Sequence, residues 1–187
     1  MTFTLGIIGS VILVVGAALR DAPMRHPSQS LKNWFFAIGA VFMATFSTLN
    51  WMAGGPVFFI FLQALVILSS VFMMLDVDDR IDSSVTVIAA LGLITWSLYL
   101  AQGYETILFI LGLVGIALGY ELKGGTVKRE VALILGSIML ALFSYLTSTW
   151  IFFWLNAFFA GFSAWQAWKV VKESQIDAHL IPPHAVG

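Results

Sequence analysis

Residues 5–20 read LGIIGSVILVVGAALR, and residues 108–123 read LFILGLVGIALGYELK. Aligned without a gap, the two stretches are identical at six positions, and Arg20 falls opposite Lys123. Apolar helices match one another by composition alone, so one such block is weak evidence. It gains weight only if neighbouring stretches repeat in the same order.

Two further stretches do repeat in that order. Residues 39–49 align with residues 136–146, and residues 59–70 align with residues 152–163. In the second alignment Gln63 is paired with Asn156. The difference in residue number between aligned positions falls from 103 to 97 to 93 along the chain. The copies therefore differ in the lengths of their loops. Duplicated helical units are typical of transporters, which bind substrate where the copies meet. The sequence therefore predicts two copies of one three-helix unit.

Composition predicts an all-α, polytopic membrane protein. The 187 residues are 60% hydrophobic and only 10% charged, whereas soluble domains average about 25% charged. Apolar runs of roughly 17–20 residues are long enough to cross a hydrocarbon core about 30 Å thick. Seven such runs occur: 3–19, 34–53, 56–75, 84–101, 105–122, 131–148 and 150–171.

Charge sets the expected orientation. With seven crossings, all nine Lys and Arg residues fall in the first, third and fifth loops and after the last helix. The positive-inside rule then places the N-terminus outside and the C-terminus in the cytoplasm, as expected for a bacterial cytoplasmic membrane. There is no cysteine, which excludes disulfides and thiolate metal sites. The net charge of −1 gives no reason to expect nucleic-acid binding.

The duplication also dictates the topology. Two three-helix units joined directly would run in opposite directions, so an unpaired helix must lie between them. The expected plan is 3+1+3: a first repeat over 1–75, an acidic loop and linker helix over 76–103, a second repeat over 104–172 and a tail over 173–187. Seven transmembrane helices would form two parallel three-helix bundles joined by the linker helix.

This plan resembles the PQ-loop/SWEET superfamily of sugar and vitamin facilitators and the PnuC-type nicotinamide riboside transporters. The sugar facilitators carry a polar amide on the third helix of each repeat, where this chain has Gln63 and Asn156. The PnuC-type proteins carry tryptophans similar to Trp34 and to the W-x-x-W pair Trp165 and Trp168. The chain departs from the sugar facilitators in having no proline inside helices 1, 2, 5 or 6. The resemblance implies a facilitator with N-out, C-in topology.

Gln63 and Asn156 are the leading candidates for substrate binding. Each shares a helix face with residues at i+3, i+4 and i+7 spacing, and a buried amide without partners costs about 2–7 kcal/mol. Both side chains are therefore expected to face the bundle interior. The alternative is that they only tie helices together. The remaining candidates for the pocket are Trp154, Phe59, Phe152, Ser70, Ser163, Ser47 and Ser144.

The resulting prediction is a uniporter for a small uncharged polar metabolite, such as a sugar or a nucleoside-like vitamin, working by alternating access. No ionisable residue falls in the middle of an apolar run, which argues against ion coupling. We expect no enzymatic activity, no metal and no cofactor. The partners would be the substrate and the bilayer, and a homo-oligomer is left open as an alternative.

Two alternatives stay open. One is a structural or accessory membrane subunit without transport, whose interior would be dry. The other is a Mg²⁺-dependent membrane enzyme that uses the aspartates of DVDDRID, residues 76–82, since carboxylate oxygens suit Mg²⁺. The second is the weaker, because no partner cluster of aspartates occurs elsewhere.

Overall fold

A computed structural model describes residues 2–19, 30–75, 79–101, 103–122 and 125–180. These residues form seven helices and no strand, which confirms the all-α prediction. The helices are α1 (Thr2–Ala18), α2 (Leu31–Met52), α3 (Phe58–Leu75), α4 (Asp79–Tyr99), α5 (Glu105–Glu121), α6 (Val127–Leu146) and α7 (Trp150–Leu180).

Local signals explain where the helices begin and end. The side chain of Ser30 accepts the backbone N–H of Asn33 at the start of α2, and Thr126 caps α6 in the same way; such caps satisfy N–H groups that have no partner inside the helix. Gly54, with φ of 94°, follows the end of α2, and Gly125, with φ of 73°, precedes α6. Glycine adopts these left-handed conformations without steric penalty.

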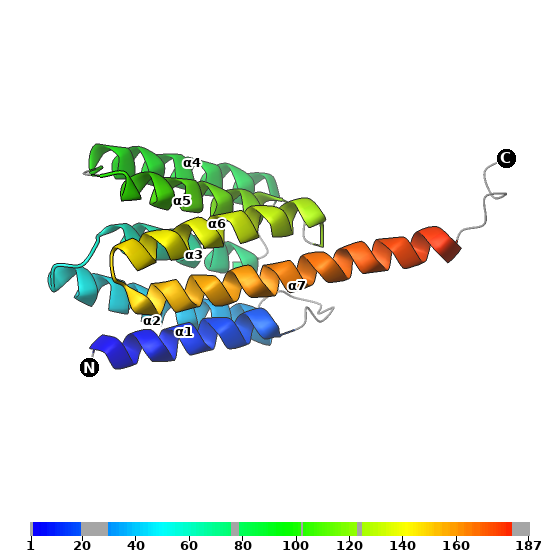
Figure 1. The fold of residues 1–187 in the computed structure, drawn as a ribbon, viewed down its shortest axis with the longest axis horizontal. Helices are drawn as coiled ribbons and strands as arrows, with labels where there is room; N and C mark the ends of the chain where they lie inside the picture. Colours follow the sequence, from blue (N-terminus) through cyan, green and yellow to red (C-terminus); the bar gives the residue numbers. More distant parts are fainter. Residues whose placement is uncertain (1, 20–29, 76–78, 102, 123–124, 181–187) are drawn as a thin grey trace.

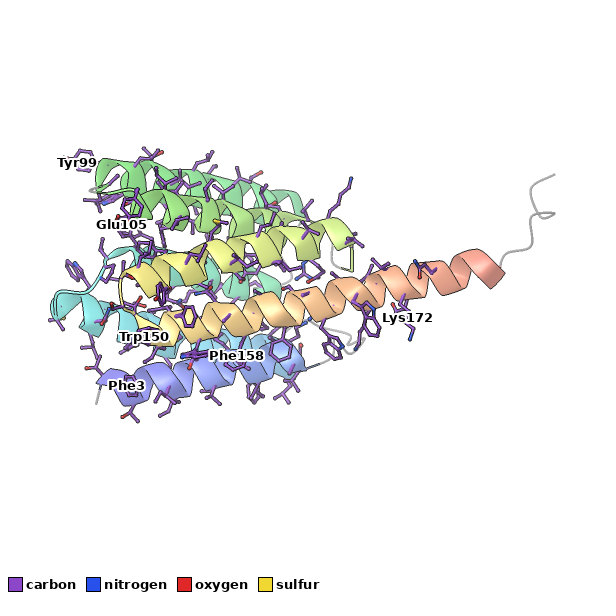
Figure 2. The ribbon with its side chains drawn as sticks, in the orientation of Figure 1. Phe3, Tyr99, Glu105, Trp150, Phe158 and Lys172 are labelled. Carbon is purple, nitrogen blue, oxygen red and sulfur yellow. The ribbon has the colours of Figure 1, made fainter. Side chains whose placement is uncertain are left out.

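The odd-numbered helices all run in one direction. Phe3, Glu105 and Trp150, near the starts of α1, α5 and α7, lie at one end of the molecule, with Tyr99 at the end of α4 beside them (Figure 2). The first copy, α1 to α3, therefore runs parallel to the second copy, α5 to α7, as the linker-helix argument requires (Figure 1). Helix α7 extends beyond the others at the opposite end.

The copies do not form two separate three-helix bundles, and this part of the prediction is wrong. Within each copy the middle helix packs against both neighbours, but α1 does not contact α3, and α5 does not contact α7. Each copy is instead a row of three helices, and the rows meet at the α1–α7 and α3–α5 edges. The six helices form a closed ring, with α4 packed outside it against α3 and α5.

Close helix contacts occur at equivalent positions in the two copies. A Cβ added to Gly9 would lie 3.0 Å from Met43 Cγ, and one added to the equivalent Gly112 would lie 2.6 Å from Leu140 Cγ. Since Met43 and Leu140 are themselves equivalent, the α1–α2 and α5–α6 contacts use the same positions. Glycines let helices approach this closely.

Among the described helices, α2 and α6 are each long and apolar enough, by length and composition alone, to cross a membrane. These two helices occupy the same position in the two copies. Shorter apolar helices span Thr2–Ala18, Phe58–Phe72 and Ser84–Tyr99.

Candidate functional site

A cavity of about 330 Å³ lies at the centre of the ring and is lined by residues from all six ring helices. This volume lies within the range of roughly 300–1,000 Å³ typical of sites for small organic ligands. None of the side chains described in α4 (84–99) lines the cavity. The linker helix therefore supports the ring from outside.

The lining follows the internal duplication almost completely. Most of the lining residues occur as pairs at equivalent positions of the two copies, with the same offsets that align the sequence. The pairs are Leu13/Ile116, Ala17/Tyr120, Lys32/Arg129, Asn33/Glu130, Phe36/Leu133, Leu62/Leu155, Gln63/Asn156, Val66/Phe159, Ser69/Phe162 and Ser70/Ser163. Leu122 and Leu140 line the cavity without their counterparts, and the counterpart of Gln166, Met73, lies outside the described side chains. The cavity therefore lies between equivalent surfaces of the two copies.

The two amides line this cavity, Gln63 from α3 and Asn156 from α7. Both side chains are buried. The Asn156 Nδ2 donates a hydrogen bond to the carbonyl of Phe152 in its own helix, at 2.8 Å, while the Gln63 Oε1 is buried without a partner. The amides therefore present polar groups to the cavity.

Hydroxyls and aromatic rings surround the amides. Ser70 and Ser163 are buried and line the cavity, as predicted. The Ser70 hydroxyl donates to the carbonyl of Val66 at 2.7 Å. Phe36 and Phe159 contact each other across the lining, with ring centroids 6.2 Å apart. The surface thus combines hydrogen-bonding groups with apolar rings, as small-molecule sites do.

A cluster of buried and half-buried phenylalanines lies beyond the cavity, toward the end where α1, α5 and α7 begin; we call this cluster the plug. Its centre is the pair Phe59 and Phe152, whose parallel rings lie 3.8 Å apart at an interplanar angle of 4°. Both rings are fully buried. The plug also contains Phe46, Phe58, Phe109 and Phe143.

The ring contacts of the plug also pair equivalent residues of the two copies. Phe59 and Phe152 are equivalent residues, so their stack joins the two copies at a common point. Phe143 contacts Phe59 with centroids 5.4 Å apart, and the equivalent Phe46 contacts Phe152 at 5.6 Å. Phe59 and Phe152 were expected to line the pocket, but neither is among the lining residues. They lie one layer beyond the lining, three residues before Leu62 and Leu155 in their helices.

The opposite end, which we call the mouth, carries the charged residues. Lys32 from α2 and Arg129 from α6 are half-buried there at equivalent positions. The Arg129 Nη1 donates to Glu130 Oε1 at 3.3 Å, and its Nε donates to the carbonyl of Gly119 at 3.3 Å. The guanidinium therefore connects the start of α6 to the end of α5.

Glu130 is a cavity residue that the sequence analysis missed. Helix α6 begins at Val127, four residues before the apolar run, so Glu130 lies in its first turn and is only 1% exposed. The Glu130 Oε2 has no hydrogen-bond partner. A signal was present: Glu130, Leu133, Ser137 and Leu140 share one helical face by spacing, and all four residues are buried or half-buried. Glu130 lies just before the expected apolar run 131–148, so no ionisable residue falls in the middle of that run, but a buried carboxylate lies at its start.

The remaining candidates lie away from the cavity. Ser47 and Ser144 are buried at equivalent positions, and each donates to the carbonyl four residues earlier, at 2.7 and 2.6 Å. Neither lines the cavity, nor does Trp154, whose side chain is 58% exposed. Trp154 lies two residues before Asn156, and two residues turn a helix by about 200°, so the two side chains leave opposite faces.

Within the described residues, no group of three or more His, Cys, Asp or Glu side chains is placed to hold a metal ion. The proposed Mg²⁺ cluster falls partly outside that description. Residues 76–78 are not described, and residues 79–82 are described only as backbone at the start of α4.

Comparisons of the chain with protein-family models, curated proteins and solved structures found no match. The resemblance to sugar, vitamin and nicotinamide riboside transporters therefore stays a prediction.

Proposed function

We propose that the protein is a seven-helix membrane transporter that carries a small polar metabolite through the central cavity by alternating access. The single observation that supports this most is the pairing of the lining residues, which puts one polar cavity between two equivalent rows of helices. Transporters built from repeats place their substrate site at such a junction.

The distribution of side chains supports membrane insertion. Polar residues such as Gln63, Asn156 and Glu130 are buried, whereas large apolar side chains are exposed on the outward faces of the helices, among them Val11, Val41, Ile88, Leu111, Leu135 and Phe158. Exposed apolar surface on this scale marks contact with lipid or another protein. A bilayer around the ring would cover it.

The tryptophans support the same arrangement. All seven are exposed. Five lie near the ends of their helices, whereas Trp165 and Trp168 lie in the middle of α7, the helix that extends beyond the others (Figure 1). Trp34 and Trp51 are separated along α2 by about 26 Å, and Trp150 and Trp168 along α7 by about 27 Å, at a rise of about 1.5 Å per residue. Belts of tryptophan at both interfaces would fit a hydrocarbon core about 30 Å thick. The Lys169 Nζ lies 3.6 Å from the centroid of Trp165, near the mouth.

The shape of the cavity fits one state of an alternating-access cycle. The cavity reaches the half-buried Lys32 and Arg129 at the mouth, and the plug lies beyond its other end. The positive-inside rule assigns the mouth to the cytoplasm, so this state would face inward. Opening to the outside would require the stacked rings of Phe59 and Phe152 to separate as the two rows rock.

A purely structural subunit is the less favoured function. That alternative expects a dry interior in which Gln63 and Asn156 hold helices together. Instead, a cavity reaches both amides, the Asn156 amide bonds within its own helix, and the Gln63 Oε1 is left without a partner. Unpaired buried acceptors suit a site that a ligand completes.

Uptake by proteoliposomes tests the proposal. We expect the wild-type protein to carry at least one of glucose, uridine and glucosamine faster than empty liposomes. Gln63→Ala and Asn156→Ala should each slow that uptake about three- to tenfold, because each removes one hydrogen-bonding group worth about 0.5–1.5 kcal/mol.

Phe158→Leu is the matched control, since Phe158 lies two residues from Asn156 but its side chain is exposed. Its uptake rate should equal that of the wild type. Equal rates for the alanine variants and the wild type would contradict the site assignment. Wild-type rates no higher than those of empty liposomes for all three solutes would contradict transport.

A further inference from the structure

Two side chains that line the cavity each carry a buried acceptor oxygen without a partner. These oxygens are the Gln63 Oε1 and the Glu130 Oε2, and both side chains are at least 98% buried. A buried acceptor that gives up water without gaining a donor lowers stability. A ligand that brings donors to both oxygens would remove that cost, so the pattern indicates a donor-rich ligand.

The charge on Glu130 is only partly compensated. Its contact with Arg129 measures 3.3 Å, longer than the roughly 2.7–2.9 Å of a strong charge-assisted hydrogen bond. The Arg129 side chain is 24% exposed, against 2% for Glu130, and it also donates to Gly119. Lys32 supplies a second positive charge from the mouth. Water screens these half-buried cations more than it screens the buried carboxylate.

Glu130 also breaks the symmetry of the site. Its equivalent in the first copy is Asn33, and the equivalent of the neighbouring lining residue Tyr120 is Ala17. The amides Gln63 and Asn156 offer similar groups from both sides, but the carboxylate stands on one side only. A ligand held by this cavity would therefore be oriented by Glu130.

We propose that Glu130 is the residue that selects and orients the substrate, and that the substrate carries a protonated amine whose N–H bonds the Glu130 Oε2. This inference rests on the proposed transport function. It replaces an uncharged metabolite with a small amine that also carries hydroxyl or N–H donors for Gln63. Glu130 is a substrate-contacting residue in this scheme, and Arg129 and Lys32 limit the cost of burying its charge.

Matched ligand pairs test the inference. Glucosamine and glucose differ in one group, ammonium against hydroxyl, as do tyramine and tyrosol. Binding to the purified full-length protein would be measured by titration calorimetry at a pH where the amines are protonated. We expect the amine of at least one pair to bind the wild type about tenfold more tightly than its alcohol, because a hydrogen bond to a charged group is stronger than a neutral one.

The variants separate a selective contact from a structural role. Glu130→Gln keeps the size of the side chain and should abolish the preference for the amine over its alcohol. Glu130→Asp keeps the charge and should retain the preference. Glu121→Gln is the control, because it removes a negative charge at the same end of the bundle from a residue outside the cavity lining.

Three results would overturn the inference: no binding of either amine, no preference in the wild type, or a preference that persists in Glu130→Gln. Failure of the transport proposal looks different. In that case the amines bind with the Glu130-dependent preference, but proteoliposomes do not accumulate them.

Discussion

Replacing Gly136 by alanine is expected to lower the thermal stability of the protein strongly, as is the same change at Gly115, whose added Cβ would lie 2.6 Å from the Gly136 Cα. A Cβ at position 136 would lie 2.7 Å from the backbone nitrogen of Ile116 and 2.9 Å from the carbonyl carbon of Gly115. Backbone cannot move aside as a side chain can, so α5 and α6 must separate. Overpacking of this kind costs about 1–3 kcal/mol, and a loss of 2 kcal/mol lowers the melting temperature by roughly 4–8 °C in a chain of this size.

Two other glycines supply the comparison. Gly39 is the equivalent of Gly136, but its nearest neighbour is the Leu13 side chain, so Gly39→Ala should cost less. Gly161 has nothing within 4 Å, so Gly161→Ala should hold or raise the melting temperature, because alanine favours helix by about 1 kcal/mol. Tryptophan fluorescence recorded during heating in detergent would give the order of the three melting temperatures. A Gly136→Ala melting temperature equal to that of Gly161→Ala would contradict the α5–α6 contact.

Phe152→Ala is expected to open the plug. Phe152 is fully buried and stacks on Phe59 at the point where the two copies meet, so removing its ring would join the cavity to the opposite end of the bundle. The change should also cost about 3–5 kcal/mol of stability, as is usual for buried phenylalanines. In a protein that also carries Asn156→Cys, a membrane-impermeant thiol reagent should then label the cysteine from both sides.

Phe109→Ala is the control for loss of stability. Phe109 is equally buried, but it packs against Phe58 and Phe143 and not in the central stack. Its removal should cost similar stability without opening a path, so labelling should stay one-sided. Two-sided labelling of both variants, or of neither, would contradict the role of the Phe59–Phe152 stack as the barrier.

Periodicity and repetition predict most of this fold. The seven helices, their order and the parallel copies follow from the apolar runs and the aligned blocks. The cavity positions of Gln63, Asn156, Ser70 and Ser163 follow as well, because a buried polar side chain among apolar neighbours has to face a polar interior. The arrangement of each copy as a row does not follow, because helix periodicity says which face is buried and not which neighbour buries it.

The mouth of the cavity was missed for a different physical reason. Hydropathy places a helix start at its first apolar residue, whereas α2 and α6 begin at their caps, Ser30 and Thr126. The polar first turns, with Lys32, Arg129 and Glu130, therefore counted as loop although they line the cavity. The prediction that Trp154 lines the pocket rested on its nearness to Asn156 in the sequence. It neglected the direction in which the Trp154 side chain leaves the helix.

Thiol labelling in vesicles tests the central claim most directly, and the chain offers a clean background because it has no cysteine. Asn156→Cys would place a thiol in the cavity. Phe158→Cys would place one at an exposed position of the same helix. A charged, membrane-impermeant reagent should label position 156 from the cytoplasmic side and leave position 158 unlabelled from either side. A protected thiol at position 156, or equally rapid labelling at position 158, would contradict a water-filled cavity inside a lipid-covered ring.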